Sequence, residues 1–454
     1  MTLNNQTHLI ITPIKPALIQ GMAQTLQALV RIQAPEPELA PSSKRKPYHL
    51  ALTIDRSGSM SGEPLHEALQ CAKYIVDRLD ANDHAALIVF DDRVKTLIPA
   101  RPIGDRKAFY TALAQVESGG ATNLYGGWQA GVNAILPTVK HSALARVLLL
   151  SDGNANVGDT TETIEIAAFC AVVVEEGVST STYGLGRDFN EELMIEMAKR
   201  GGGNHYYGDN AADLYEPFAA EFDLIANLFA RQLNLTLRVP EGVKVKLLND
   251  YVFEQRAYDI SISLPDLPLG AEAWALVELE IPAHLALESG CELLQASISA
   301  RSPEGYELNF ADQRLALNTL SPNAWEVLIQ DPLVLARQAE LAAGIFLTQL
   351  RQITEYEDWE TIQKMINTGR QRFADHPWVI DVLDSMANLA DSKDVSRFRK
   401  EAMYSSRRMT SRLSAKHEDI KYCRTSELDS ASFLRRKPLQ GKAIFEQRPE
   451  DDFI

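Results

Sequence analysis

The stretch Ile54-Asp55-Arg56-Ser57-Gly58-Ser59-Met60 lies between an apolar run, 48–54, and a helical pattern that begins at Pro64. The apolar run is typical of a buried β-strand. Asp55, Ser57 and Ser59 are therefore predicted to lie on a loop at the carboxyl end of a strand, where open α/β sheets bind ligands. All three side chains offer hard oxygen donors, and a tight turn through Gly58 would aim them at one point.

Two later stretches also offer side-chain oxygen donors. Thr122 lies in the loop 119–123, and Asp152 follows the apolar run 147–150. A set of carboxylate and hydroxyl oxygens is what Mg²⁺ prefers in proteins. An ordinary turn is the alternative interpretation of the first stretch taken alone, since Ser and Asp are common in turns. The five candidate metal ligands are Asp55, Ser57, Ser59, Thr122 and Asp152.

The order of these residues resembles the metal-ion-dependent adhesion site of von Willebrand factor type A (VWA) domains, over roughly residues 45–230. The resemblance implies a Mg²⁺ ion, with Mn²⁺ or Ca²⁺ as other candidates, held by the hydroxyls of Ser57, Ser59 and Thr122. It implies that Asp55 and Asp152 contribute directly or through water. It also implies that the open position on the metal accepts an Asp or Glu carboxylate from a protein partner.

Residues 47–230 alternate strand and helix patterns, which predicts an α/β fold with a Rossmann-like, doubly wound, mostly parallel sheet. After the strand at 48–54, strands are predicted at 85–90, 94–99, 146–150 and 178–183, with a short one at 204–207. Helices are predicted near 64–79, 105–117, 127–138, 161–176, 190–200 and 211–230.

Strict alternation of apolar and polar residues returns in 231–320, which predicts an antiparallel β-sandwich. The N-terminal region, 1–46, holds a further alternating run at 26–32 and ends in a linker rich in Pro, Ser and charge. Because these N-terminal strands need a sheet to join, we predict that they complete the sandwich. The α/β domain would then be inserted into it.

Apolar residues recur at helical spacing in 321–418, which predicts a helical domain with Asp358 as a helix N-cap and Pro377 at the start of a helix. The segment 419–454 has mixed charge and few apolar residues, and it is predicted to be a flexible tail. Within it, the sequence Phe433-Leu434-Arg435-Arg436-Lys437 is either a short recognition element or part of an undocked tail.

The 454-residue chain has a net charge of −16, which argues against nucleic acid as its main partner. Basic residues are in excess in 392–454, although the rest of the chain taken together is acidic, so this region either folds back on the acidic body, seeks an acidic partner or is simply solvated. Cys71 and Cys170 lie in apolar helical patterns and are predicted to be core residues. The chain shows no signal peptide and no apolar stretch of membrane-spanning length, which predicts a cytoplasmic protein.

The leading functional hypothesis is a metal-dependent protein–protein interaction module that acts as an intracellular adaptor or scaffold. By likeness of layout to bacterial multi-domain proteins, its partner could belong to an AAA+ ATPase or a kinase–phosphatase system. A Mg²⁺-dependent enzyme such as a phosphatase is an alternative, but the chain has no phosphate-binding glycine loop and its histidines form no cluster. A scaffold in which the metal is only structural is the third interpretation.

Overall fold

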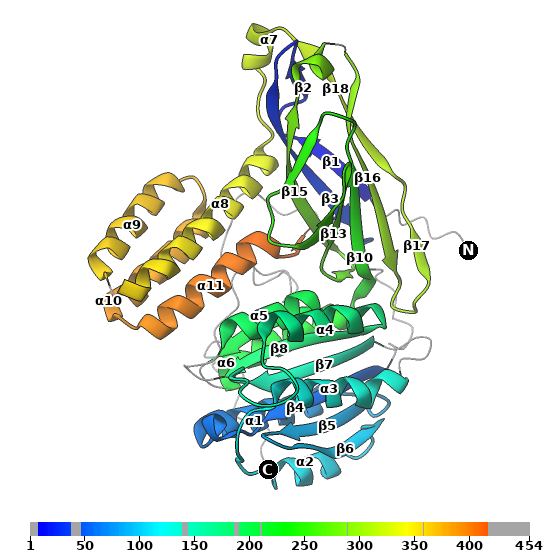
Figure 1. Cartoon of the computed structure of the whole chain (residues 1–454), viewed down its shortest axis with the longest axis vertical. Helices are drawn as coiled ribbons and strands as arrows, with labels where there is room; N and C mark the ends of the chain where they lie inside the picture. Colours follow the sequence, from blue (N-terminus) through cyan, green and yellow to red (C-terminus); the bar gives the residue numbers. More distant parts are fainter. Residues whose placement is uncertain are drawn as a thin grey trace. The chain divides into compact units, whose positions relative to one another are not determined.

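The computed structural model describes residues 8–37, 47–138, 144–185, 190–208, 211–287, 289–356 and 358–415. These residues form two compact units, and most of their helices and strands are labelled in Figure 1. One unit is 47–227 with the short segment 303–306, and the other joins 8–37 to 228–302 and 307–415. The predicted tail, 419–454, lies outside the described residues, as does most of the predicted linker.

The first unit contains a six-stranded sheet in the order β6-β5-β4-β7-β8-β9. Every pairing in it is parallel except β5 with β6, so the predicted α/β fold with a mostly parallel sheet is confirmed. Its strands are β4 (Tyr48–Asp55), β5 (His84–Phe90), β6 (Val94–Pro102), β7 (Leu144–Ser151), β8 (Val178–Leu185) and β9 (Gly202–Gly208). Its helices are α1 (Glu63–Arg78), α2 (Lys107–Leu113), α3 (Leu124–Ile135), α4 (Thr163–Glu175), α5 (Glu191–Arg200) and α6 (Ala211–Ala226), with the 3₁₀ turns η1 (Gly58–Met60) and η2 (Leu136–Thr138).

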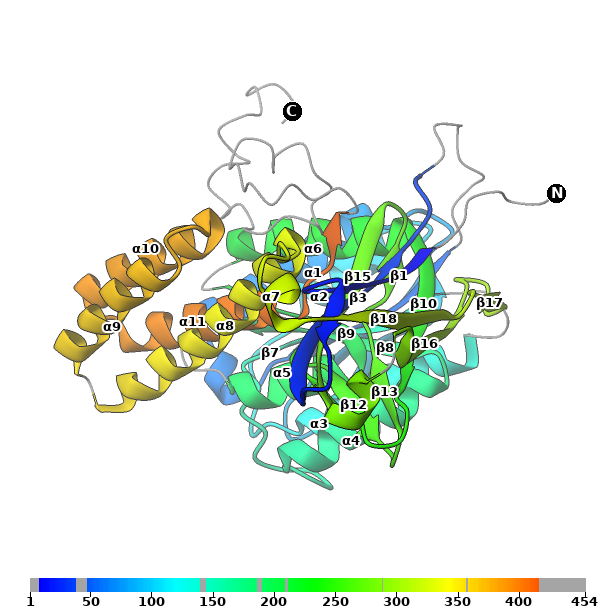
Figure 2. The same cartoon turned by 90° about the horizontal axis from the view of Figure 1, so that it is seen from above.

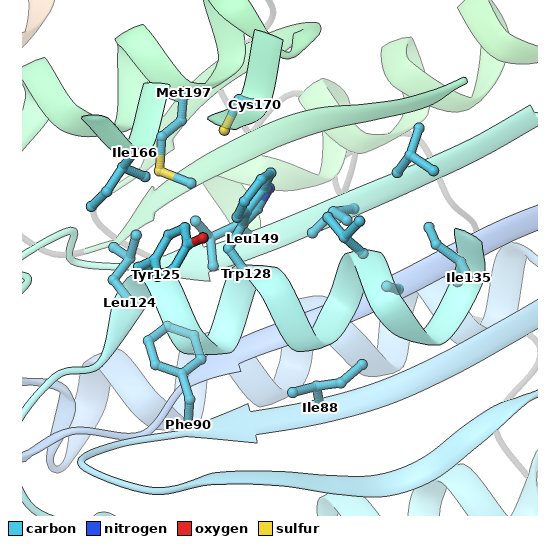
Figure 3. Packing of buried hydrophobic residues seen from close by; sticks show 14 of the residues in the cluster. Ile88, Phe90, Leu124, Tyr125, Trp128, Ile135, Leu149, Ile166, Cys170 and Met197 are labelled. Carbon is cyan, nitrogen blue, oxygen red and sulfur yellow. The ribbon is translucent and has the colours of Figure 1, made fainter. Parts of the chain in front are cut away.

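Helices cover both faces of this sheet, as a doubly wound fold requires. On one face, α3, α4 and α5 pack on β4, β5 and β7 through a cluster that includes Phe90, Trp128 and Met197 (Figure 3). On the other face, α1 packs against α6, where Tyr74 stacks on Tyr215. The two cysteines predicted to be core residues, Cys71 of α1 and Cys170 of α4, are buried as free thiols.

Element ends differ from the predicted ones where a local contact decides them. Helix α3 begins at Leu124 instead of 127, because the side chain of Asn123 accepts a hydrogen bond from the backbone nitrogen of Gly126 and caps the helix. Helix α6 ends at Ala226 and the next strand begins at Leu228, so the α/β unit ends slightly before the predicted boundary at 230.

The second unit contains two sheets that lie face to face (Figures 1 and 2). The first has the order β1-β3-β15-β11 with β19 on β15, and the second has the order β12-β13-β10-β16-β18-β2 with β14 and β17 at its sides. All pairings are antiparallel except β18 with β2. The first sheet's strands are β1 (His8–Pro13), β3 (Gln24–Gln33), β11 (Lys244–Leu247), β15 (Ala271–Ile281) and β19 (Ser414–Ala415). The second sheet's strands are β2 (Ala17–Ile19), β10 (Leu228–Arg238), β12 (Val252–Gln255), β13 (Asp259–Ser263), β14 (Leu267–Pro268), β16 (Cys291–Arg301), β17 (Glu307–Asn309) and β18 (Gln313–Leu320).

The N-terminal strand β3 pairs with β15 along its whole length, from Gln33 opposite Glu272 to Gln24 opposite Ile281. The strands on either side of the α/β unit in the chain therefore share one sheet. Side chains alternate between the two faces of a strand, and β15 is buried on both faces over most of its length, whereas β3 is buried mainly on one face and at Leu29 on the other. One face turns Leu29, Trp274 and Leu276 toward α8 (Pro332–Ile353).

The helical part contains α7 (Pro322–Glu326), α8, α9 (Trp359–Arg372), α10 (Pro377–Ser392) and α11 (Val395–Ser411), with η3 (Ala283–Ala286) and η4 (Thr354–Tyr356) as short 3₁₀ turns of the same unit. The N-cap predicted at Asp358 is present, since its Oδ1 accepts a hydrogen bond from Thr361 N at 3.0 Å. Among the described residues only 332–356, which includes α8, is long and apolar enough to span a membrane. Its buried apolar residues pack in the helical core and against β15, whereas Ile345 is exposed.

A buried carboxylate, Glu221 of α6, ties this helix to the sheet. It forms an ion pair with Arg146 of β7 and accepts hydrogen bonds from Ser181 at 2.6 Å and Asn204 at 2.8 Å. Burial alone would raise the pKa of Glu221, but the Arg146 guanidinium and these hydrogen bonds outweigh it and lower the pKa below its ordinary value. The stabilisation is present above the ordinary glutamate pKa and is lost as the pH falls through the lowered value.

We expect Glu221→Gln to lower the free energy of unfolding of the α/β unit by about 3–5 kcal/mol at pH 7, because it removes the charge that offsets buried Arg146. Urea unfolding measures the change. The control is Glu192→Gln, which alters an exposed residue of α5 and should change stability by less than about 0.5 kcal/mol. Equal effects of the two substitutions would contradict the assignment.

Candidate metal centre

The pairing of β4 with β7 places two polar residues side by side at the centre of the site. In the pairing of β4 with β7, Ile54 lies opposite Leu150, so the next residues, Asp55 and Ser151, meet at the carboxyl edge of the sheet. Oδ2 of Asp55 accepts a hydrogen bond from Ser151 Oγ at 2.6 Å. Oδ1 of Asp55 accepts one from Ser57 N at 2.8 Å. The two carboxylate oxygens of Asp55 are thus held in place by the end of β7 and by the loop that follows β4.

The hydroxyls of the first loop meet above this carboxylate. Ser57 Oγ and Ser59 Oγ lie 3.2 Å apart, and the short turn η1 that carries Ser59 is anchored by the buried side chain of Met60. Ser57 is buried, whereas Ser59 is exposed. Ser57 therefore lies on the buried side of the loop, next to Asp55, and Ser59 lies on the exposed side.

The second loop is tethered to the first by backbone hydrogen bonds. Gly119 N donates to Arg56 O at 2.6 Å, and Gly58 N donates to Gly120 O at 2.8 Å. A Cβ at Gly119 would lie 1.7 Å from Asp91 Oδ2, so this close approach requires glycine. Asp91 also pairs with the guanidinium of Arg56 at 2.7 Å.

The third loop is joined to the second at Thr122. Thr122 N donates to Asn156 Oδ1 at 2.7 Å, and Asn156 N donates back to Thr122 O at 3.1 Å. Asp152 caps the start of this loop, where its Oδ1 accepts from Asn154 N at 3.1 Å. Its carbonyl accepts from Asn190 N at 2.7 Å, which holds the loop against the start of α5.

The structure thus places all five predicted ligands on three loops at one edge of the sheet. It brings Asp55, Ser57 and Ser59 into direct contact, and it connects Thr122 and Asp152 to them through the tethers between the loops. Four of the five are buried: Asp55, Ser57, Thr122 and Asp152. That they bind a metal stays a prediction.

Several residues that hold the site together were not anticipated from sequence. Ser151 directly precedes Asp152 in the chain, and its position at the end of a buried strand was the available signal. Asn156 and the Arg56–Asp91 ion pair had no local signal, because their partners come from distant loops. Trp128, six residues after Thr122, is a core residue that donates a hydrogen bond to Thr180.

Burial raises the pKa of Asp55 to about 6, and the nearby carboxylate of Asp152 adds to the rise, while hydrogen bonds from Ser151 and Ser57 act against it. The one guanidinium in these loops, that of Arg56, is paired with Asp91. A divalent cation would supply the positive charge that the site lacks, and the donors are the hard oxygens that Mg²⁺ favours. Outside such mixed hydroxyl and carboxylate sets, the described residues contain no group of three His, Cys, Asp or Glu that could hold a metal.

Residues 49–219 match the family model of the von Willebrand factor type A domain. The α/β unit, with its mixed sheet between helical layers, is therefore a VWA domain.

Two solved structures extend the likeness beyond this domain. A von Willebrand factor type A protein from Catenulispora acidiphila aligns with a TM-score of 0.66 and 15% identity over 89% of this chain and 98% of that one. The ArnB paralog VWA2 from Sulfolobus acidocaldarius aligns with a TM-score of 0.56 and 17% identity over 89% of this chain and 99% of that one. At these identities the likeness shows the fold alone.

The curated relatives each match less than half of this chain. The uncharacterised protein sll0103 of Synechocystis is 26% identical over 43% of this chain and 46% of its own length. Protein YfbK of Escherichia coli is 26% identical over 46% of this chain and 35% of its own length. The human inter-alpha-trypsin inhibitor heavy chain H3 is 28% identical over 37% of this chain and 20% of its own length. The chain thus spans less than half the length of these relatives.

We expect Asp55→Asn to stabilise the metal-free protein at pH 7.5 by on the order of 2–3 kcal/mol, because the amide carries no charge to desolvate. The raised pKa of Asp55 means that the folded state holds its proton more tightly than the unfolded chain. Stability therefore falls as the pH rises from about 4 to about 6 and stays lower above that.

The difference between variant and wild type should accordingly shrink toward zero at pH 4, as measured by urea unfolding in EDTA. Asp92→Asn, at an exposed carboxylate on the turn after β5, is the matched control and should show no such trend. A loss of stability in Asp55→Asn that is the same at both pH values would contradict the electrostatic argument.

We expect Ser151→Ala to lower the free energy of unfolding by about 1–3 kcal/mol, because it leaves Asp55 Oδ2 and the backbone nitrogen of Gly153 without their shared hydroxyl. Thermal unfolding in EDTA at pH 7.5 measures the loss. Ser61→Ala removes an exposed hydroxyl beside the same loop and should leave the melting temperature unchanged. Wild-type stability in Ser151→Ala would show that the hydroxyl does not hold the two strand ends together.

Proposed function

We propose that the VWA domain is a metal-dependent module for protein–protein interaction within an intracellular adaptor or scaffold. Mg²⁺ would be held by the hydroxyls of Ser57, Ser59 and Thr122, with Asp55 and Asp152 contributing directly or through water. VWA domains are in general protein-interaction modules. The open position on the metal would take an Asp or Glu carboxylate from the partner.

The observation that carries this proposal is the buried carboxylate of Asp55. Its pKa is raised by burial, and no Lys or Arg in the described part of the chain offsets it. Two hydrogen-bond donors, the backbone nitrogen of Ser57 and the hydroxyl of Ser151, nevertheless hold it in a fixed position. A charged group kept at this cost is typical of a binding site and not of a structural contact.

The choice of ligands favours an external carboxylate. Hydroxyl oxygens are neutral, so they leave the charge of a bound Mg²⁺ to be offset by Asp55 and Asp152 alone. Where those carboxylates act through water, the ion's immediate ligands carry no charge, and an anionic oxygen from outside binds favourably. Ser59 is exposed on the same loop, which keeps a path open to the metal position.

The intracellular setting is part of the proposal. Its support is that Cys71 and Cys170 are buried as free thiols. Free thiols are usual in proteins of reducing compartments.

Isothermal titration calorimetry with Mg²⁺, Mn²⁺ and Ca²⁺ tests the metal site. We expect one divalent ion per chain, with an affinity about tenfold or more weaker in Ser59→Ala, because an exposed ligand is removed without disturbing the core. Ser61→Ala, two residues further on and equally exposed, should bind the metal as wild type does. Equal metal affinity in the two variants would contradict the assigned ligands.

The partner's carboxylate is tested by capture from a lysate in Mg²⁺ and in EDTA, with wild type and Ser59→Ala as baits. A partner retained only by wild type in Mg²⁺, and lost when one of its own acidic residues is changed to the amide, would support the proposal. Circular dichroism in EDTA separates the alternative: unfolding on metal removal would make the ion structural. Phosphatase activity that depends on Mg²⁺ and disappears in Ser59→Ala would instead make the site catalytic.

A further inference from the structure

Helix α4 is apolar on the side that the fold leaves uncovered. Ile166 and Cys170 point into the core of the VWA domain. On the outer side, Ile164 is 78% exposed and Val172 is 58% exposed, with exposed Ala168 midway between them. Residues four apart lie in line along a helix, so these three form one continuous stripe. A helix that is apolar all round is normally buried on all sides.

Phe169 widens this stripe on one flank. Its ring is 43% exposed and lies 5.0 Å from the ring of Tyr125 in α3. An exposed apolar surface with a polar border is typical of a site where another chain segment binds. We call the surface formed by Ile164, Ala168, Phe169 and Val172 the α4 face.

The charges that border the α4 face are all acidic within its own segment. The chain has no Lys or Arg between Arg146 and Arg187. The neighbouring helix α5 adds acidic residues near its start and two basic residues, Lys199 and Arg200, at its end. The exposed carboxylates at the two ends of α4 and along it are Asp159, Glu162, Glu165, Glu175 and Glu176. An occupant of the α4 face should therefore combine apolar and basic residues.

We propose that the α4 face is the docking site for the segment 433–437 of the same chain. That segment reads Phe433-Leu434-Arg435-Arg436-Lys437, with two large apolar residues followed by three basic ones. It lies in the stretch 431–445, which contains four basic residues and no acidic one although the chain as a whole carries a net charge of −16. Phe433 and Leu434 would cover Ile164, Ala168 and Val172, and the basic residues would meet the carboxylates at the border.

The length of the connecting chain allows this contact. The described structure ends at Ala415 in β19, and Phe433 follows 18 residues later. A chain of that length reaches roughly 60 Å when extended, which exceeds the width of a domain of this size. Because the segment is covalently attached, its effective concentration at the α4 face is high, and modest contacts are enough to hold it there.

Cysteine cross-linking in the full chain tests the proposal. Cysteines are introduced by Ala168→Cys and Leu434→Cys, and two native cysteines are removed by Cys291→Ser and Cys423→Ser. The other two, Cys71 and Cys170, are kept, because burial raises the pKa of both thiols and leaves them unreactive. Oxidised glutathione then drives disulfide formation, followed by non-reducing electrophoresis and peptide mapping. The matched control replaces Ala168→Cys by Lys73→Cys, at an exposed position of α1 on the opposite face of the sheet.

We expect the Ala168→Cys pair to form an intramolecular disulfide about tenfold or more faster than the Lys73→Cys pair, through the higher effective concentration at a docked site. Adding Arg435→Glu and Arg436→Glu should remove most of this difference in rate between the two pairs. Equal rates for the two pairs would overturn the proposal, as would a rate that is unchanged by the charge reversal. Disulfide-linked dimers formed by Ala168→Cys alone, in preference to the intramolecular bond, would assign the α4 face to a second copy of the chain and would also overturn it.

Discussion

The candidate site depends on the parallel alignment of β4 with β7, which places Asp55 beside Ser151 at one edge of the sheet. The hydrogen bond between these two side chains fixes the carboxylate, and Ser151 Oγ in turn accepts from Gly153 N at the entry of the third loop. A shift of β4 by one residue along β7 would turn Asp55 to the opposite face of the sheet, away from Ser151. The apolar interior of the sheet therefore sets the geometry of the polar edge, since burial of the strands is what specifies their register.

The same domain buries two carboxylates, Glu221 and Asp55, and their surroundings shift the pKa values in opposite directions. Glu221 has a paired guanidinium and several hydrogen-bond donors, so its pKa is lowered and its burial contributes to stability at neutral pH. Asp55 has hydrogen-bond donors but no cation, so its pKa is raised and its charge costs stability. The first arrangement is complete within the protein. The second lacks a positive charge, and this difference distinguishes a structural carboxylate from one available to a ligand.

A feature of this fold could be predicted where the residues that form it lie close together in the sequence. The apolar run that ends at Asp55, the alternation in 26–32 and the N-cap at Asp358 are local patterns, and the α/β class and the accompanying antiparallel sheets could be predicted from them. The start of α3 was misplaced because its cap, Asn123, lies in a loop considered only for its hydroxyl. Ser151, Asn156 and the Arg56–Asp91 pair act through contacts between loops far apart in the chain, and no spacing in the sequence marks such contacts.

The α4 face and the metal edge are built from the same elements. The loop that begins at Asp152 leads directly into α4, and its Asn156 is bonded to Thr122. Phe169 of the α4 face packs on Tyr125, which lies three residues after Thr122 in the first turn of α3. A segment docked on α4 and a partner at the metal would therefore both touch this loop. Occupancy of one surface would change access to the other through direct crowding, without any change in the fold of the domain.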